Sequence, residues 1–153
     1  MKKITITIAL AFFAMLTFAQ IENPVKWTYT AKKISADTYE LHITATIQPK
    51  WHLYAQDAGE GPVPTKITVD KSPLLKLDGT TKELGKLIKE YDPNFKSTLK
   101  FYSNKVNFVQ KVKVKAGAST IAKGKVTFMV CNDEKCLPPK DVAFAIKVGK
   151  VTT

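Results

Sequence analysis

The feature that most constrains the fold is an alternation of apolar and polar residues that recurs along the chain. It is clearest over residues 39–48, where the apolar members are Tyr39, Leu41, Ile43, Ala45 and Ile47. A period of two places all of these side chains on one face of an extended strand. This segment is therefore predicted to be a half-buried β-strand that ends at Pro49.

Similar patterns elsewhere predict an all-β protein. Further strands are expected at 25–33, 67–69, 74–77, 99–102, 106–114, 120–130 and 142–148, with turn residues between them. Residues 81–91 are charged and irregular, and a single helical turn is the most regular structure expected there. About seven to nine strands with short turns and almost no helix predict a two-sheet antiparallel β-sandwich.

The only two cysteines, Cys131 and Cys136, flank a predicted turn. An apolar run precedes Cys131, and Asn132 and Asp133 favour a turn because their side chains can hydrogen-bond nearby backbone groups. The stretch is therefore predicted to be a β-hairpin with one cysteine on each arm. Residues that face each other across such arms come within reach of a disulfide bond.

A disulfide at this place has two interpretations. Closing a loop of about six residues stabilises a fold by roughly 2 kcal/mol, against about 4 kcal/mol or more for ~70 residues, so a short loop favours a bond that opens and closes. Strand parity points the same way: Phe128 and Val130 belong to the apolar stripe, so Cys131 faces away from the predicted core and is expected to be accessible. A structural staple remains the alternative.

The N-terminus is typical of an exported protein. Two lysines precede an apolar run from Ile4 to Ala19, which is shorter than the ~20 residues of a membrane-spanning helix and ends in small residues. We interpret Met1–Ala19 as a cleaved signal peptide and residues 20–153 as one domain that does not span a membrane. Export places the cysteines where disulfides form and persist.

The charge of the chain is strongly basic but does not indicate nucleic-acid binding. The chain has 24 Lys and Arg against 13 Asp and Glu, a formal net charge of +11, and all the basic residues are lysines. Arginine, which is preferred for bidentate phosphate and base contacts, is absent. We therefore expect a solvated, lysine-rich surface and no nucleic-acid partner.

Four aromatic or imidazole side chains are candidates for the surroundings of a site. Residues 51–54 alternate, so His52 and Tyr54 share the polar face, where they either meet solvent or lie beside a site. Tyr91 and Phe95 lie on a predicted loop, where they either pack against the edge of the core or cover a site.

A metal site is a weaker alternative. A closed zinc site needs four ligands, and the candidates, which are Cys131, Cys136, His42 and His52, match no common zinc spacing. Soft copper binding by the two cysteines with Met129 is chemically allowed. We predict neither a metal nor another cofactor.

Several motifs together resemble one family. They are Trp51-His52-Leu53-Tyr54, Gly61-Pro62-Val63-Pro64-Thr65, the Phe95 loop that leads to Phe101-Tyr102, and Cys131-Asn132-Asp133-Glu134-Lys135-Cys136-Leu137-Pro138-Pro139. Between about Val25 and Val148 the chain resembles the periplasmic N-terminal domain of the thiol–disulfide interchange reductase DsbD. The resemblance implies an immunoglobulin-like antiparallel β-sandwich and a periplasmic location.

The resemblance also implies a function. A domain of this kind takes electrons from a thioredoxin-like domain or a membrane electron carrier and passes them to oxidised periplasmic thiol proteins, as a component of a protein-disulfide reductase and in cytochrome c biogenesis. In the family pattern Cys136 forms the mixed disulfide with the partner, Cys131 resolves it, and Phe95 shields the pair. The other residues expected around the pair are Tyr91, His52 and Tyr54.

Two features depart from the family pattern. Four residues separate the cysteines instead of five, and no membrane-spanning channel or terminal thioredoxin domain is seen, so a stand-alone domain reduced by a separate partner is expected.

The expected chemistry is dithiol–disulfide exchange, in which only the thiolate reacts. Lys135 favours the thiolate of Cys136, whereas Asp133 and Glu134 oppose it, and His52 or Tyr54 could assist proton transfer. A cap over the pair would have to open when a partner binds. The alternative function is a non-catalytic binding module in which the disulfide is a local staple.

Overall fold

The computed structural model describes residues 22–149 of the chain. The predicted signal peptide, Met1–Ala19, lies outside these residues. Within the described range, no helix has the length and apolar character that crossing a membrane requires.

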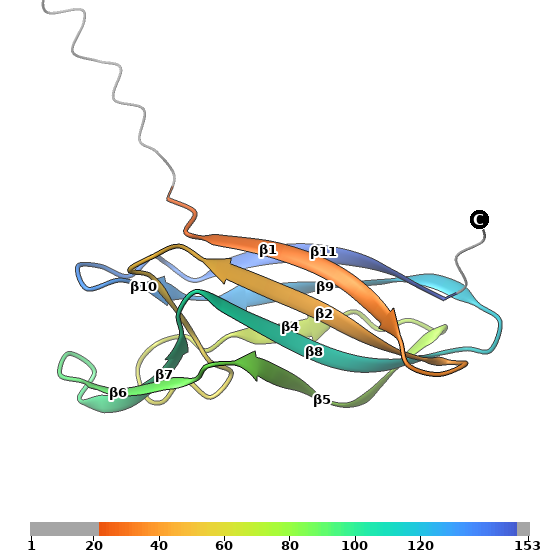
Figure 1. Ribbon diagram of the computed structural model, residues 1–153, viewed down its shortest axis with the longest axis horizontal. Helices are drawn as coiled ribbons and strands as arrows, with labels where there is room; N and C mark the ends of the chain where they lie inside the picture. The colour runs from red at the N-terminus through yellow and green to blue at the C-terminus, as the bar shows by residue number, and fades with distance from the viewer. Residues whose placement is uncertain (1–21, 150–153) are drawn as a thin grey trace, which may run out of the picture.

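The described residues form eleven β-strands, and every strand pairing is antiparallel (Figure 1). In chain order the strands are β1 (Val25–Lys33), β2 (Thr38–Ile47), β3 (His52–Tyr54), β4 (Lys66–Val69), β5 (Leu75–Gly85), β6 (Ile88–Asp92), β7 (Ser97–Tyr102), β8 (Lys105–Val114), β9 (Ser119–Phe128), β10 (Val130–Cys131) and β11 (Lys140–Gly149).

Two sheets, in the orders β1-β2-β8-β5 and β11-β9-β4, enclose the main core. The first contributes Leu41, Ile43 and Phe108, and the second contributes Val126 and Phe144. Trp27 of β1 joins the layers, because its ring centroid lies 6.1 Å from that of Phe108 and 5.2 Å from that of Phe128. Strands β1 and β11 run side by side along one edge (Figure 1). The predicted all-β antiparallel sandwich is confirmed.

The alternation in β2 corresponds to its burial. Its apolar residues from Tyr39 to Ile47 are buried, whereas His42 and Thr44 between them are only partly covered. The strand pairs with β1 on one side and β8 on the other, so one face of a central strand packs into the core. This is the arrangement that an apolar stripe of period two predicts.

The helical turn expected within residues 81–91 was wrong. The short strand expected at 74–77 is the start of the eleven-residue strand β5, which is followed by the strand β6, and the count of strands exceeds the expected seven to nine. Both are edge strands that expose most of their side chains, so their sequences carry little alternation. A bulge between Asp78 and Lys82 interrupts β5, and the buried Gln110 fills it by accepting a hydrogen bond from Thr81 Oγ1 at 2.7 Å.

The third sheet, in the order β10-β3-β7-β6, lies at one end of the sandwich (Figure 1). One of its faces contributes Leu53, Tyr102 and Val130 to the main core. The other face carries a separate apolar cluster, which we call the end cluster. Its buried members are Tyr54, Ala58, Leu99 and Cys131, and Phe95, Phe101 and Met129 pack against them. Cys131 therefore lies on the face of this small sheet that points away from the main core, whereas Val130 beside it packs into the main core.

Candidate functional site

Cys131 and Cys136 are joined by a disulfide, with sulfur atoms 2.00 Å apart, and face each other as an antiparallel bridge. The Asn132 N–H donates to the Lys135 carbonyl at 2.9 Å, and Asn132 Oδ1 accepts the N–H groups of Glu134 at 2.9 Å and Lys135 at 2.8 Å. The predicted hairpin is confirmed, and Asn132 closes its turn through the side-chain hydrogen bonds on which the prediction rested.

The two cysteines differ in exposure. Cys131 is only 2% exposed and belongs to the end cluster, whereas Cys136 is exposed. The parity argument was right that Cys131 faces away from the main core. The expectation that both cysteines are accessible was wrong for Cys131, because side chains from neighbouring strands, including Leu99, cover it. A partner can therefore reach Cys136 first.

His52 lies directly opposite Cys131, since β10 pairs with β3 in the register Cys131 to His52 and Val130 to Leu53. Directly opposed residues of antiparallel strands share one face of the sheet. The His52 ring centroid lies 4.5 Å from that of Phe101 and 5.4 Å from that of Tyr54, and His52 Nε2 lies 3.4 Å from Tyr54 Oη. The structure thus brings His52 and Tyr54 together beside the buried cysteine.

Phe95 lies in the turn between β6 and β7, half-buried against the end cluster. Asp92 Oδ1 shapes this turn by accepting the N–H groups of Asn94 at 2.8 Å and Phe95 at 3.2 Å. The Phe95 ring rests against Gly61, where a Cβ atom would overlap it. Tyr91, in contrast, is 62% exposed.

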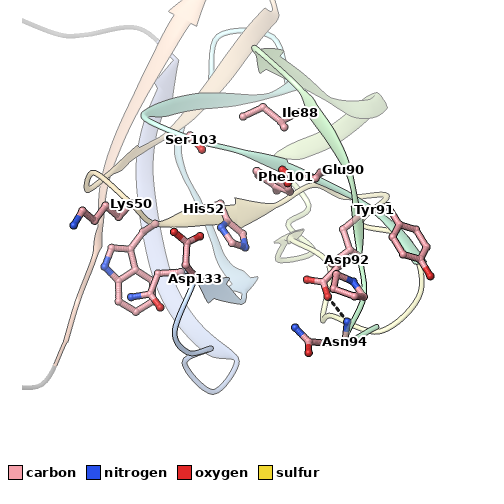
Figure 2. Close-up of a pocket in the computed structure, with 14 residues that line it drawn as sticks. Lys50, His52, Ile88, Glu90, Tyr91, Asp92, Asn94, Phe101, Ser103 and Asp133 are labelled. Carbon is pink, nitrogen blue, oxygen red and sulfur yellow. Dashed lines mark hydrogen bonds between the residues drawn. The ribbon is translucent and has the colours of Figure 1, made fainter. Parts of the chain in front are cut away.

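A pocket of about 540 Å³ opens between this turn and the cysteine hairpin (Figure 2). His52 and Phe101 line its inner wall, and Asp133 reaches it from the hairpin. Tyr91 lines its outer rim, with the ring turned away from the other labelled side chains. Glu90 and Asp92 give the pocket an acidic side, which the sequence alone did not indicate in so lysine-rich a chain.

The surroundings shift two ionisable groups in ways that matter for proton transfer. Burial lowers the pKa of His52, although the carboxylates of Asp133, Asp92 and Glu90 partly oppose this. Burial, with a smaller effect of Asp92, raises the pKa of Tyr54 to about 12. Near neutral pH His52 is therefore a neutral imidazole able to accept a proton, and Tyr54 remains a phenol.

Lys135, which was expected to favour the Cys136 thiolate, is engaged elsewhere. Its Nζ atom lies 2.7 Å from Glu22 Oε2. Sequence reasoning missed Glu22, and it also missed Ala58 and Leu99 of the end cluster. No local pattern marks these residues, because strands and loops distant in sequence bring them to the hairpin.

The four side chains considered as zinc ligands do not all converge, because His42 belongs to a different sheet from His52 and Cys131. His42 lies on β2, where Nδ1 accepts a hydrogen bond from Asn107 Nδ2 at 2.8 Å and Nε2 lies 3.6 Å from Glu40. Over residues 22–149, no three His, Cys, Asp or Glu side chains gather as metal ligands do.

Residues 21–147 match the family model described as the N-terminal part of the thiol:disulfide interchange protein DsbD. The chain belongs to this family. The resemblance of its motifs to the DsbD N-terminal domain is therefore confirmed. No curated protein matches the chain.

Two solved structures of related domains have the same fold. The N-terminal periplasmic domain of ScsB from Proteus mirabilis superposes with a TM-score of 0.56 at 19% identity, covering 79% of this chain and 44% of that one. The DsbD N-terminal domain of Neisseria meningitidis in its reduced form gives a TM-score of 0.54 at 18% identity, covering 81% of this chain and 86% of that one. This chain thus spans less than half of the ScsB structure. Membership of the DsbD family implies thiol–disulfide redox partners in general.

Proposed function

We propose that this DsbD N-terminal domain relays electrons in the periplasm through Cys131 and Cys136. The donor is a thioredoxin-like domain or a membrane electron carrier, and the acceptors are oxidised exported proteins. The observation that best supports this proposal is the unequal exposure of the two cysteines outside the main core, with Cys136 open to a partner and Cys131 covered. A staple between the sheets would instead have both sulfurs in the main core.

The relay runs in two halves. In the first half a donor thiolate attacks Cys136 Sγ, the bond between Cys136 and Cys131 breaks, and Cys131 leaves as a thiolate that takes up a proton. The second donor thiol then attacks the donor sulfur of this mixed disulfide, which releases Cys136 as a thiolate and leaves the donor oxidised. In the second half the Cys136 thiolate attacks an acceptor disulfide and forms a mixed disulfide. Cys131 then attacks Cys136 Sγ, restores the internal disulfide and releases the reduced acceptor.

Phe95 is proposed to shield the pair between these steps. Its ring packs against the cluster that contains Cys131, and the turn that carries it closes one side of the pocket. A cover over the sulfurs protects the dithiol from oxidation by other molecules and has to move when a partner docks. Tyr91, at the exposed rim of the pocket, is proposed to be among the first residues that a partner meets.

The location follows from the predicted signal peptide, Met1–Ala19, and from the family. The related ScsB domain is described as periplasmic. We propose that residues 20–153 are exported as one domain.

Trapping of the mixed disulfide tests the proposal. The reduced Cys131→Ala variant has no resolving thiol, so an oxidised thioredoxin-like protein should remain linked to it through Cys136, whereas Cys136→Ala should give no adduct. A reduction potential in the range of exchange proteins, about −120 to −270 mV, is expected for the wild type. Absence of an adduct together with a potential below about −300 mV would instead favour the structural staple in a non-catalytic binding module.

A further inference from the structure

The buried cysteine of the proposed relay has a problem of proton transfer. Cys131 has to become a thiolate before it can attack the mixed disulfide on Cys136. It is 2% exposed and packed among apolar side chains, an environment that disfavours a charged sulfur and keeps bulk water away.

We propose that His52 is the general base that takes the proton from the Cys131 thiol in this resolving step. The inference rests on the proposed function and deepens it by assigning one proton transfer to one residue. His52 is the direct cross-strand neighbour of Cys131, and the Cβ atoms of such pairs lie about 4.5–5.5 Å apart on the same face of the sheet. This spacing brings an imidazole within reach of a thiol.

The neighbouring aromatic rings hold the ring of His52 in place. The ring lies against Phe101 and meets Tyr54 edge-on, with an interplanar angle of 85°. If Nε2–H donates to Tyr54 Oη, 3.4 Å away, the lone pair of Nδ1 is free to accept the proton from Cys131. Tyr54 is then a positioning residue, and its raised pKa of about 12 prevents it from acting as the base itself.

The charges that face His52 favour this assignment. Three carboxylates line the same pocket and stabilise an imidazolium once it forms; they belong to Glu90 and Asp92 of β6 and to Asp133 of the hairpin. Lys50 also lines the pocket and is the cation that opposes them. Burial keeps the resting ring neutral, and the carboxylates lower the cost of charging it briefly.

The step balances without any further reactant. The Cys131 S–H gives its proton to His52, and the thiolate attacks Cys136 Sγ. The Cys131–Cys136 bond forms as the bond between Cys136 and the partner sulfur breaks, and the partner thiolate takes the proton from the imidazolium. The partner has gained the electron pair, the domain is oxidised, and His52 is neutral again.

A chromogenic aromatic disulfide, dithiobis(nitrobenzoate), separates the two chemical steps. Reduced protein mixed with it should release one coloured thiolate when Cys136 attacks and a second when Cys131 resolves the adduct. In His52→Gln the first phase should stay within about twofold of the wild type, and the second should slow by about 10²–10⁴-fold near neutral pH. The loss should shrink as pH rises, because the thiol then ionises without a base.

Controls keep the test decisive. His42→Gln changes the other histidine, on β2 in a different sheet, and should leave both phases unchanged. If His52→Gln does not fold, Asp133→Asn in the exposed turn gives an independent measurement. It removes a carboxylate that favours the imidazolium, so the acid limb in the pH dependence of the second-phase rate should move to lower pH.

The possible outcomes separate this inference from the function on which it rests. No release of either thiolate by the reduced wild type contradicts the exchange function itself. Two normal phases in the wild type, with an unchanged second phase in His52→Gln or an unmoved acid limb in Asp133→Asn, overturn the role of His52 alone.

Discussion

The Lys135 ammonium lies 2.7 Å from a carboxylate oxygen of Glu22, so an ion pair connects the start of the described chain to the hairpin that carries the disulfide. Both side chains are about half-exposed, which limits the stability that the pair contributes to well under about 1 kcal/mol. Its electrostatic effect on Cys136 is of more interest, because Lys135 is the only cation next to Cys136 in sequence and Glu22 partly neutralises its charge.

Glu22→Gln is expected to make Cys136 more reactive. The change removes the carboxylate that is paired with Lys135, so the ammonium next to Cys136 in sequence is no longer neutralised and favours the thiolate. In the reduced Cys131→Ala background, the midpoint pH of Cys136 alkylation should fall by a few tenths of a pH unit. The expected change is small because the ion pair is exposed and solvent screens it. Lys135→Gln should move the midpoint upward. A rise in Glu22→Gln would show that the ion pair does not restrain the cation.

The contact between Phe95 and Gly61 predicts a way to open the cover of Cys131. Gly61 has φ of 118°, and an added Cβ would overlap the Phe95 ring. Gly61→Ala should therefore displace the ring, lower stability by about 1–3 kcal/mol and speed reduction of the disulfide by dithiothreitol, because Cys131 Sγ becomes a second target. Denaturant unfolding and single-exponential reduction rates measure the two effects.

Gly79→Ala is the matched control. Gly79 also has a positive φ, 76°, but no atom lies within 4 Å of the added Cβ. This variant should lose about 1 kcal/mol of stability from backbone strain and keep the wild-type reduction rate. Equal acceleration in both glycine variants would attribute the effect to general loosening instead of displacement of Phe95.

The sequence was informative wherever one face of a strand is buried in the main core. β2 and β8 could be predicted because their apolar residues alternate along their lengths, and the cysteine hairpin could be predicted because Asn132 acts within three residues of itself. Most of β5 and all of β6 could not, since these two edge strands expose most of their side chains and carry no apolar stripe.

The surroundings of the disulfide were only partly predictable for a different reason. Alternation placed His52 and Tyr54 on one face, but the pairing of His52 with Cys131 depends on the register of β3 against β10. The burial of Cys131 depends on Ala58 and Leu99, which other segments bring to the end cluster. Such contacts arise from tertiary packing, which a local sequence pattern does not reveal.

The side chain of Asn132 predicts how the hairpin sets the redox balance. Asn132 Oδ1 accepts two backbone N–H groups, and loss of these bonds in Asn132→Ala should loosen the turn more in the dithiol form, since the disulfide itself holds the oxidised turn. Closing the bond then costs about 1 kcal/mol more, so the reduction potential should become more positive by up to about 20 mV. Equilibration with dithiothreitol buffers measures it.

Asn132→Asp is the control for this change. It keeps an oxygen acceptor at the same position, so its potential should stay closer to that of the wild type than that of Asn132→Ala. An unchanged or more negative potential in Asn132→Ala would mean that the turn is equally ordered in both redox forms.

The lowered pKa of His52 predicts that the oxidised protein loses stability in mild acid. Its pKa is below the unfolded value of about 6.5, so between the two values the unfolded chain binds more protons than the folded one. This contribution to stability is fully present above about pH 6.5 and is lost as pH falls through the folded pKa. Denaturant unfolding near pH 7.5 and near pH 5.5 measures the loss of stability. These two values lie about one pH unit on either side of the pKa of the unfolded state.

Comparison of variants isolates the share of His52, because carboxylates elsewhere titrate in all of them. His52→Gln should lose less stability between the two pH values than the wild type. Asp133→Asn removes the carboxylate that most strongly opposes the shift, so its loss should be larger than that of the wild type. If Asp133→Asn instead showed a smaller loss, the carboxylate of Asp133 would not oppose the shift of the His52 pKa, and this electrostatic account of His52 would have to be discarded.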